Sequence, residues 1–181
     1  HSSVTMGITA NFCAAILFTA VLAATSVHGT CPGEFVQIGA AGCCYYFSSD
    51  HHNVPTLTKA ASQQFCQHIS TTNSMNIDLY ELSIGSPCGN YQELTAALYT
   101  RGRHTWLGAN YNATGESWVW QNSGKKLAPT SILWKSGFPK DGTGEDCLAT
   151  DGGIPRRPYV YNLVCMYQLN FVCQIFNILS K

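Results

Sequence analysis

The spacing of hydrophobic positions changes along the chain and divides it into stretches of different predicted structure. Over Phe35–Phe47, β-branched and aromatic residues surround an interruption at Gly39–Gly42, which predicts a short β-hairpin. Over Leu57–Ile69, apolar residues recur at helical spacing, which predicts an amphipathic helix from about Thr58 to His68. After Thr105 the pattern changes again, to short runs rich in aromatic residues that are typical of strands.

The middle of the chain is less periodic. Ser70–Asn90 is rich in Ser, Asn and Gly and is predicted to form a long linker or irregular loop. Apolar residues at helical spacing over Tyr91–Leu98 predict a second helix, with Asn90 as its N-cap and Gly102 beyond its end.

The last third of the chain combines strands with one long polar segment. Gln121–Asp146 is rich in Gly, Lys, Pro and Ser, and a loop of this length in a compact domain is usually functional or disordered. The layout predicts an α+β fold with two helices and small antiparallel sheets, braced by disulfides around a long irregular loop. The strands predicted after the second helix are Trp106–Gly108, Trp118–Trp120, Leu148–Thr150, Tyr159–Val164 and Asn170–Cys173.

The first 29 residues contain no Lys, Arg, Asp or Glu. Their apolar core, Cys13–Ala24, is too short to span a bilayer and has the length of the hydrophobic region of a secretory signal. We therefore expect residues 1–29 to comprise upstream residues and a signal peptide, with Met6 as initiator and Thr30 as mature start. Residues 30–181 then form one domain, with no membrane span, secreted to the extracellular space.

Charge and cysteine content narrow the class of protein. Ten basic and ten acidic residues give a net charge of zero, and no block of like charge points to a nucleic-acid partner. Asn112 begins an N-glycosylation sequon, Asn-Ala-Thr. An even number of cysteines behind a secretory signal predicts disulfides formed in an oxidising compartment. The cysteines expected in the mature chain are Cys31, Cys43, Cys44, Cys66, Cys88, Cys147, Cys165 and Cys173.

The ordered landmarks from Cys31 to Phe176 resemble the C-type lectin-like domain, in its long form and as found in secreted single-domain lectins of invertebrates. The first helix ends in Phe65-Cys66, as in that family, and Trp106-Leu107-Gly108-Ala109 is similar to its core strand Trp-Ile-Gly-Leu. The segments Trp118-Val119-Trp120 and Gly144-Glu145-Asp146-Cys147 follow in the family's order, with Trp134 between them.

The resemblance implies a set of disulfides. It pairs Cys66 with Cys173, Cys147 with Cys165, and Cys31 with Cys44 as the extra bridge of longer members. Cys43 and Cys88 remain, and the simplest arrangement, Cys43-Cys88, joins them. Because Cys43 and Cys44 are adjacent, their roles could be exchanged, and the last pair could form within one chain or between two.

The resemblance also implies a calcium ion on the long loop, bridging protein and sugar through six to eight oxygen ligands. The family supplies ligands from a triplet centred on proline, a glutamate before a cysteine, and an Asn-Asp pair on the next strand. Pro139 matches the proline, but its neighbours Phe138 and Lys140 carry no carboxylate or amide oxygen, and Lys140 places a cation beside the metal. Asp141 could shift by one position and replace one ligand.

The rest of the family's ligand set is partly retained. Glu145 matches the glutamate, Asp146 its acidic neighbour and Asn162 the strand asparagine, whereas Leu163 replaces the strand aspartate and Tyr161 the usual tryptophan. We therefore expect weak calcium binding or none. The carbohydrate-binding candidates are Glu145, Asn162, Asp141, Lys140 and Tyr161, and the candidates for a degenerate calcium site are Glu145, Asp146 and Asn162.

Three functions are compatible with this pattern, one of which is an ice- or mineral-binding surface. The first is a secreted lectin-like module of innate immunity that binds glycans or microbial surface polymers with weak or no calcium dependence. The alternative is a domain whose sugar site has degenerated and whose partner is an extracellular protein, as an inhibitor, toxin-like or receptor-type binder. Catalysis is not expected, because no nucleophile motif occurs and adjacent Glu145 and Asp146 point apart on an extended backbone. Tyr159, Tyr161 and Phe138 are the candidates for exposed stacking on a sugar, whereas the tryptophans are expected mainly in the core.

Overall fold

The computed structural model describes residues 31–39, 42–73, 75–82, 88, 91–101, 104–140, 144–151 and 159–176. The predicted signal peptide, Asn90, Gly102 and Asp141 lie outside these residues. Two α-helices and nine strands occur in the described part of the chain, and the α+β class is confirmed. In chain order they are β1 (Val36–Ile38), β2 (Cys43–Phe47), α1 (Lys59–Asn73), β3 (Ile77–Leu79), α2 (Tyr91–Arg101), β4 (Thr105–Asn112), β5 (Ser117–Trp120), β6 (Lys126–Leu127), β7 (Cys147–Thr150), β8 (Val160–Leu163) and β9 (Asn170–Ile175).

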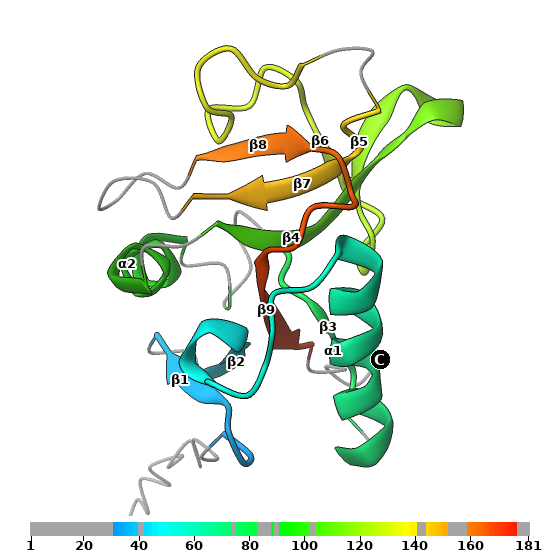
Figure 1. Cartoon of the computed structure of the whole chain (residues 1–181). Coiled ribbons are helices and arrows are strands. Elements are labelled where there is room, and N and C mark those ends of the chain that lie inside the picture. The colour runs from blue at the N-terminus through cyan, green and yellow to red at the C-terminus, as the bar shows by residue number, and fades with distance from the viewer. Residues whose placement is uncertain are drawn as a thin grey trace, which may run out of the picture.

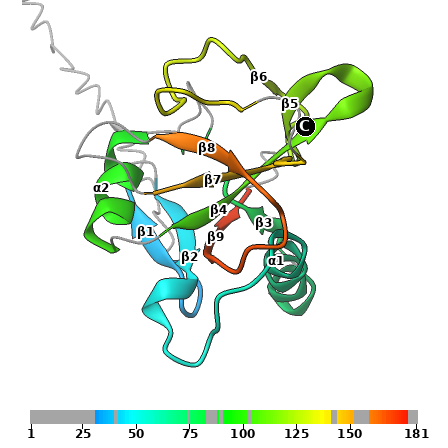
Figure 2. The same cartoon turned by 45° about the horizontal axis from the view of Figure 1, so that its top comes forward.

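Strand β9 organises the sheet. It pairs with β2 along one side and with β3 and β4 along the other. Strand β4 pairs in turn with β5, which pairs with β6. Strand β4 also pairs with β7, and β7 pairs with β8. Figure 1 shows α1 and α2 on opposite sides of the central strands, and Figure 2 shows the same separation after rotation. Neither described helix is long and apolar enough to cross a membrane.

The sheet is mixed, which corrects the expectation of purely antiparallel sheets. Strands β4 and β9 run parallel, with Thr105 opposite Asn170 and Trp106 opposite Phe171. Parallel strands need a long crossover connection, and here the whole long loop and the β7–β8 hairpin lie between the two strands in sequence. Strand direction therefore follows from this distant connection, which the local pattern of each strand does not contain.

The first helix and the segment after it differ from the prediction. Thr58 caps α1: its Oγ1 accepts a hydrogen bond from the Ala61 N–H at 3.4 Å, and its carbonyl accepts one from the Ser62 N–H at 2.9 Å. The helix continues to Asn73, and β3 follows at Ile77–Leu79, so the predicted linker is wrong in its first part. Strand β3 is short and forms because it pairs with β9, a strand about 100 residues away in sequence.

A glycine in β4 allows close packing of the segment that follows β3. The Gly108 N–H donates to the Tyr80 carbonyl at 2.7 Å. A Cβ at Gly108 would lie 2.6 Å from the Leu79 carbonyl oxygen and 3.1 Å from that of Tyr80. Both atoms belong to the backbone, so no side-chain rotation would relieve the contact, which explains the glycine of the Trp-Leu-Gly triplet.

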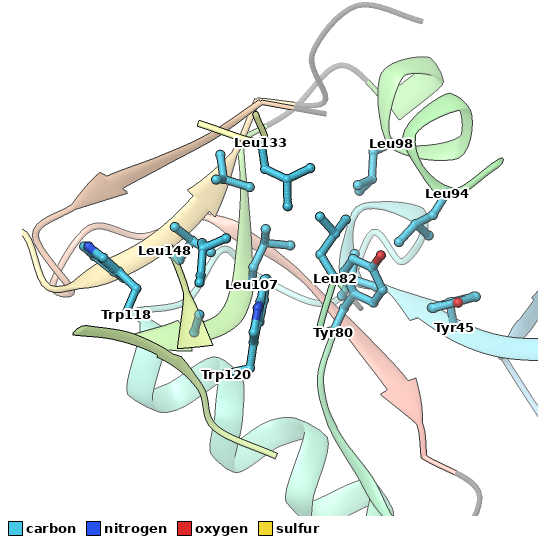
Figure 3. Close-up of a cluster of buried hydrophobic side chains, with 14 of the residues drawn as sticks. Tyr45, Tyr80, Leu82, Leu94, Leu98, Leu107, Trp118, Trp120, Leu133 and Leu148 are labelled. Carbon is cyan, nitrogen blue, oxygen red and sulfur yellow. The ribbon is translucent and has the colours of Figure 1, made fainter. Parts of the chain in front are cut away.

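Buried side chains form two clusters, one on each side of the sheet. The larger one joins the β1–β2 hairpin, α2, the central strands and the long loop, and Figure 3 shows Tyr45, Leu94 and Leu133 converging there. The expectation that the tryptophans belong to the core is confirmed, since Trp106, Trp118, Trp120 and Trp134 are all at most 7% exposed.

The structure contains the four disulfides that the sequence suggested, all within one chain: Cys31–Cys44, Cys43–Cys88, Cys66–Cys173 and Cys147–Cys165. Adjacent Cys43 and Cys44 have different partners because neighbouring residues of a strand point to opposite faces. Cys43 packs in the larger cluster, whereas Cys44 packs against the smaller one.

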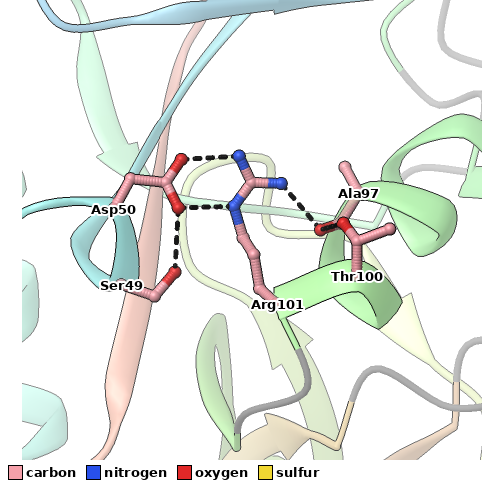
Figure 4. Close-up of polar contacts among 5 residues, drawn as sticks. All are labelled: Ser49, Asp50, Ala97, Thr100 and Arg101. Carbon is pink, nitrogen blue, oxygen red and sulfur yellow. Dashed lines mark hydrogen bonds and ion pairs between the residues drawn. The ribbon is translucent and has the colours of Figure 1, made fainter.

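A partly buried ion pair fixes the end of α2 (Figure 4). The Arg101 guanidinium donates from Nε to Oδ1 of Asp50 at 2.8 Å and from Nη2 to Oδ2 at 2.5 Å. Its third nitrogen donates to the Ala97 carbonyl at 2.7 Å, and the group lies 3.9 Å from the centre of the Phe47 ring. Arg101 lowers the pKa of the Asp50 carboxyl by hydrogen bonding and charge.

Candidate functional site

The loop between β6 and β7 is anchored along β8. The Val160 N–H donates to the Leu133 carbonyl at 2.8 Å, and the Lys135 N–H donates to the Val160 carbonyl at 2.9 Å. The indole Nε1 of buried Trp134 donates to the Ala128 carbonyl at 2.9 Å and closes the loop on itself. The first half of the loop is therefore held against β8 by hydrogen bonds, and it brings Phe138–Lys140 beside Tyr161 and Asn162.

Asn162 holds the second half of this loop and is 1% exposed. Its Oδ1 accepts from the Lys140 N–H at 2.9 Å. Its Nδ2 donates to the Lys140 carbonyl at 2.8 Å and to the Glu145 carbonyl at 3.0 Å. Both amide hydrogens and the oxygen are thus engaged with the loop backbone, so Asn162 supports the loop in this structure, and its role toward a sugar or calcium stays a prediction.

Tyr161 is also an internal residue and is 6% exposed. Its ring packs edge-on against Phe138, with centroids 5.8 Å apart, and its hydroxyl is hydrogen-bonded to Nδ1 of His104. Burial raises the pKa of the Tyr161 hydroxyl, and the negative charge of Asp151 raises it further. The expectation of an exposed stacking platform is therefore wrong for Tyr161. Phe138 and Tyr159 keep only part of their surface exposed.

The remaining candidates lie nearer the surface. Asp146 and Lys140 are exposed, with the Lys140 Nζ 5.1 Å from the centre of the Phe138 ring. Glu145 is half-buried, and its Oε2 is buried without a hydrogen-bond partner. A buried carboxylate oxygen without a donor is costly, so this atom favours a cation or a hydrogen-bond donor nearby.

The described residues do not supply a calcium site. Calcium needs six to eight oxygen ligands, and the part of the chain that the structure describes contains no group of three or more His, Cys, Asp or Glu residues placed to hold a metal ion. Glu145 and Asp146 are carboxylates, but the Asn162 oxygen already accepts a backbone hydrogen bond and Lys140 brings a positive charge to the same loop. The chemistry of the loop thus agrees poorly with a resident divalent cation.

Sequence reasoning missed two residues of this region. His104 contacts the Tyr161 hydroxyl, and Lys135 places its Nζ 5.7 Å from the centre of the Tyr161 ring while it forms a 2.8 Å ion pair with Asp151. His104 lies outside every motif, so no sequence signal indicated it. Lys135 directly follows Trp134, one of the motif residues, and this position was the sequence signal that could have pointed to it.

The chain resembles known proteins in its structure and not in its sequence. No family model and no curated protein sequence matches the chain. Among solved structures, the chain is similar to the C-type lectin CEL-I from Cucumaria echinata, with a TM-score of 0.58 and 18% identity over 82% of this chain and 99% of that one. It is similar to the C-type lectin domain of murine dendritic cell inhibitory receptor 2, solved with an N-glycan, with a TM-score of 0.58 and 19% identity over 81% and 98% of the two chains.

A third similar structure is a calcium-independent type II antifreeze protein, with a TM-score of 0.57 and 16% identity over 80% of this chain and 93% of that chain. These structures share the architecture while differing in what their names say they bind. The chain has the C-type lectin-like fold, as the order of its motifs predicted. This likeness shows the fold alone, and the ligand of the protein must be argued from its own residues.

Proposed function

We propose that this protein is a secreted carbohydrate-binding module of the pattern-recognition type, with weak or no dependence on calcium. Its ligands are glycans or microbial surface polymers. The observation that carries the calcium independence is the Asn162 side chain, which is buried and hydrogen-bonded to loop backbone in place of an ion. The fold it shares with CEL-I and with a glycan-bound receptor domain supports a carbohydrate ligand.

Three features support secretion. Four disulfides are typical of proteins from oxidising compartments, and the uncharged N-terminal stretch has the pattern of a signal peptide. The sequon residue Asn112 is exposed at the end of β4, where its Oδ1 accepts a hydrogen bond from the Thr114 N–H at 3.1 Å. This leaves Nδ2, the atom that carries an N-linked glycan, on the surface.

The test is binding of the disulfide-bonded protein to an array of glycans, with millimolar calcium and separately with EDTA. We expect the same glycans to be bound with nearly the same signal in both conditions. Calorimetric titration with calcium, with Glu145→Gln as the control variant, checks the metal directly. Loss of all glycan signal in EDTA, together with a calcium site that Glu145→Gln removes, would refute calcium independence.

One observation favours the alternative of a protein partner. The turn between β8 and β9 exposes three apolar side chains, Val164 (37% exposed), Met166 (74%) and Tyr167 (57%). Exposed apolar clusters of this kind are common at protein interfaces. If the array shows no glycan binding while an extracellular protein binds the wild type and not a Met166→Ser, Tyr167→Ser variant, the alternative replaces the lectin function.

A further inference from the structure

A pocket is lined by none of the residues Phe138–Lys140, Glu145 and Asn162. It has a volume of about 290 Å³ and is formed by the segment after β3, the β5–β6 turn and the first part of the long loop. Leu82, Leu127 and Leu133 form its apolar walls together with Trp120. Figure 3 shows how Leu82, Trp120 and Leu133 come from separate segments to the same region. The volume lies at the lower limit for small-molecule sites and suits one sugar ring.

The pocket contains a buried acidic group, Glu81, which is 4% exposed. Its Oε2 accepts from the Ser123 N–H at 3.1 Å, and its Oε1 accepts from the Ser123 hydroxyl. These two donors fix the carboxylate but use only about half of the acceptor positions of a carboxylate. The group is thus positioned and partly removed from water, with capacity to accept further hydrogen bonds.

Two exposed lysines, Lys125 and Lys126, line the same pocket as Glu81. A carboxylate only accepts hydrogen bonds, and an ammonium group only donates them. A sugar hydroxyl does both, so it can donate to Glu81 and accept from a lysine. An anionic ligand would be attracted by the lysines but repelled by buried Glu81, and a cationic ligand would be attracted by Glu81 but repelled by the lysines. A neutral ligand with hydroxyl groups meets no like charge in this pocket.

We propose that this pocket is a calcium-free subsite for a neutral sugar residue, with Glu81 accepting and Lys125 or Lys126 donating hydrogen bonds to its hydroxyl groups. The proposal rests on the carbohydrate-binding function proposed above. It locates that function on residues that no metal ion needs to organise. It also explains why a buried carboxylate at position 81 is held by both donors of Ser123.

The experiment uses the disulfide-bonded protein labelled with ¹⁵N and titrated in EDTA with methyl glycosides of glucose, mannose, galactose and N-acetylglucosamine. The Ser123 amide and the Trp120 indole N–H report on the pocket, and the Asn162 side-chain amide reports on the loop. We expect shifts at Ser123 and Trp120, and weaker binding of glucuronate than of the neutral glucoside. Glu81→Gln should weaken binding at least about tenfold, because a hydrogen bond to a charged group is lost.

Glu116→Gln is the matched control, since Glu116 is exposed in the β4–β5 turn and does not line the pocket. It should bind as the wild type does. A double variant, Lys125→Met, Lys126→Met, tests the donors without altering a buried group, and it should also lose at least about tenfold in affinity.

The outcomes separate the two proposals. If glycosides bind in EDTA but shift Asn162 and not Ser123, and Glu81→Gln binds normally, the subsite is wrong and the lectin function stands. Preferential binding of glucuronate or glucosamine in the pocket would also overturn the neutral-sugar assignment. If neither the array nor the titration detects any sugar, both proposals are refuted.

Discussion

Replacing Lys59 by methionine removes a buried ammonium group from the N-terminal turn of α1. Lys59 is 2% exposed, and its Nζ donates to Oδ1 of Asn110 at 2.7 Å and to Oε1 of Gln121 at 3.2 Å. Burial lowers the pKa of this lysine from 10.5 to about 8, against an opposing effect of the negative charge of Asp78. The folded protein therefore holds the Lys59 proton less tightly than the unfolded chain does.

The sign and size of the effect on stability follow from this difference. Below pH 8 both states are protonated, and the fold bears the full penalty of the buried charge. A fall of the pKa from 10.5 to about 8 corresponds to roughly 3 kcal/mol. As the pH rises from 8 to 10, the folded state loses the proton first, so the free energy of unfolding should rise by about 2 kcal/mol through this group. Burial raises the pKa values of Tyr45 and Tyr46 to about 12, so stability should fall again above pH 10.

The assay is urea unfolding followed by tryptophan fluorescence at constant ionic strength from pH 7 to pH 10, with the disulfides intact. The measured quantity is the difference in unfolding free energy between wild type and Lys59→Met at each pH, in which the other titrating groups cancel. This difference should shift in favour of the wild type by about 2 kcal/mol between pH 8 and pH 10. Lys140→Met, at an exposed lysine, should show no such shift. Parallel pH curves for wild type and Lys59→Met would refute the reasoning.

Three further changes test other parts of the fold. Gly108→Ala should destabilise the protein by about 3 kcal/mol or more, measured by urea unfolding, because its methyl group meets backbone oxygens; a change below about 1 kcal/mol would contradict the packing. Asn162→Asp should cost about 2–4 kcal/mol, since the new carboxylate faces the Lys140 and Glu145 carbonyls; stabilisation of this variant by calcium would instead indicate a metal site. Asp50→Asn should lower the free energy of unfolding by about 1 kcal/mol at pH 7. The folded pKa of Asp50 lies below its unfolded value, so the stabilisation is lost as the pH falls through the folded pKa, and the difference between wild type and variant should disappear on acidification. A difference that persists at pH 2 would contradict this assignment.

The pattern of apolar and turn residues predicted those helices and strands that form because of residues near them in sequence. The hairpin around β1 and β2, the start of α1 at Lys59 and the second helix all follow from spacing and turn residues near them in sequence. Strand β3 was missed because three residues form a strand only when β9 is present to pair with them. The parallel pairing of β4 and β9 was missed for the same reason, since direction depends on a connection of many residues.

The candidate site shows the same division. Composition established that the loop around Pro139 lacks most of the oxygens of a calcium site, and that statement needs no coordinates. It could not show that Asn162 and Tyr161 are both buried, because these adjacent residues lie on opposite faces of β8 and only the packing of the fold covers both faces. Nor could it place Glu81 in a pocket with Lys125 and Lys126, which lie over 40 residues away and meet it only through the folded β5–β6 turn.

The sequence by itself determined the C-type lectin-like fold, because cysteines, tryptophans and glycines in a fixed order carry much of the information about a disulfide-braced core. The tertiary structure alone decided which polar groups are available to a ligand. Burial and hydrogen-bond saturation depend on contacts between segments far apart in the chain, so Asn162 became a support of the loop and Glu81 became the carboxylate of a pocket.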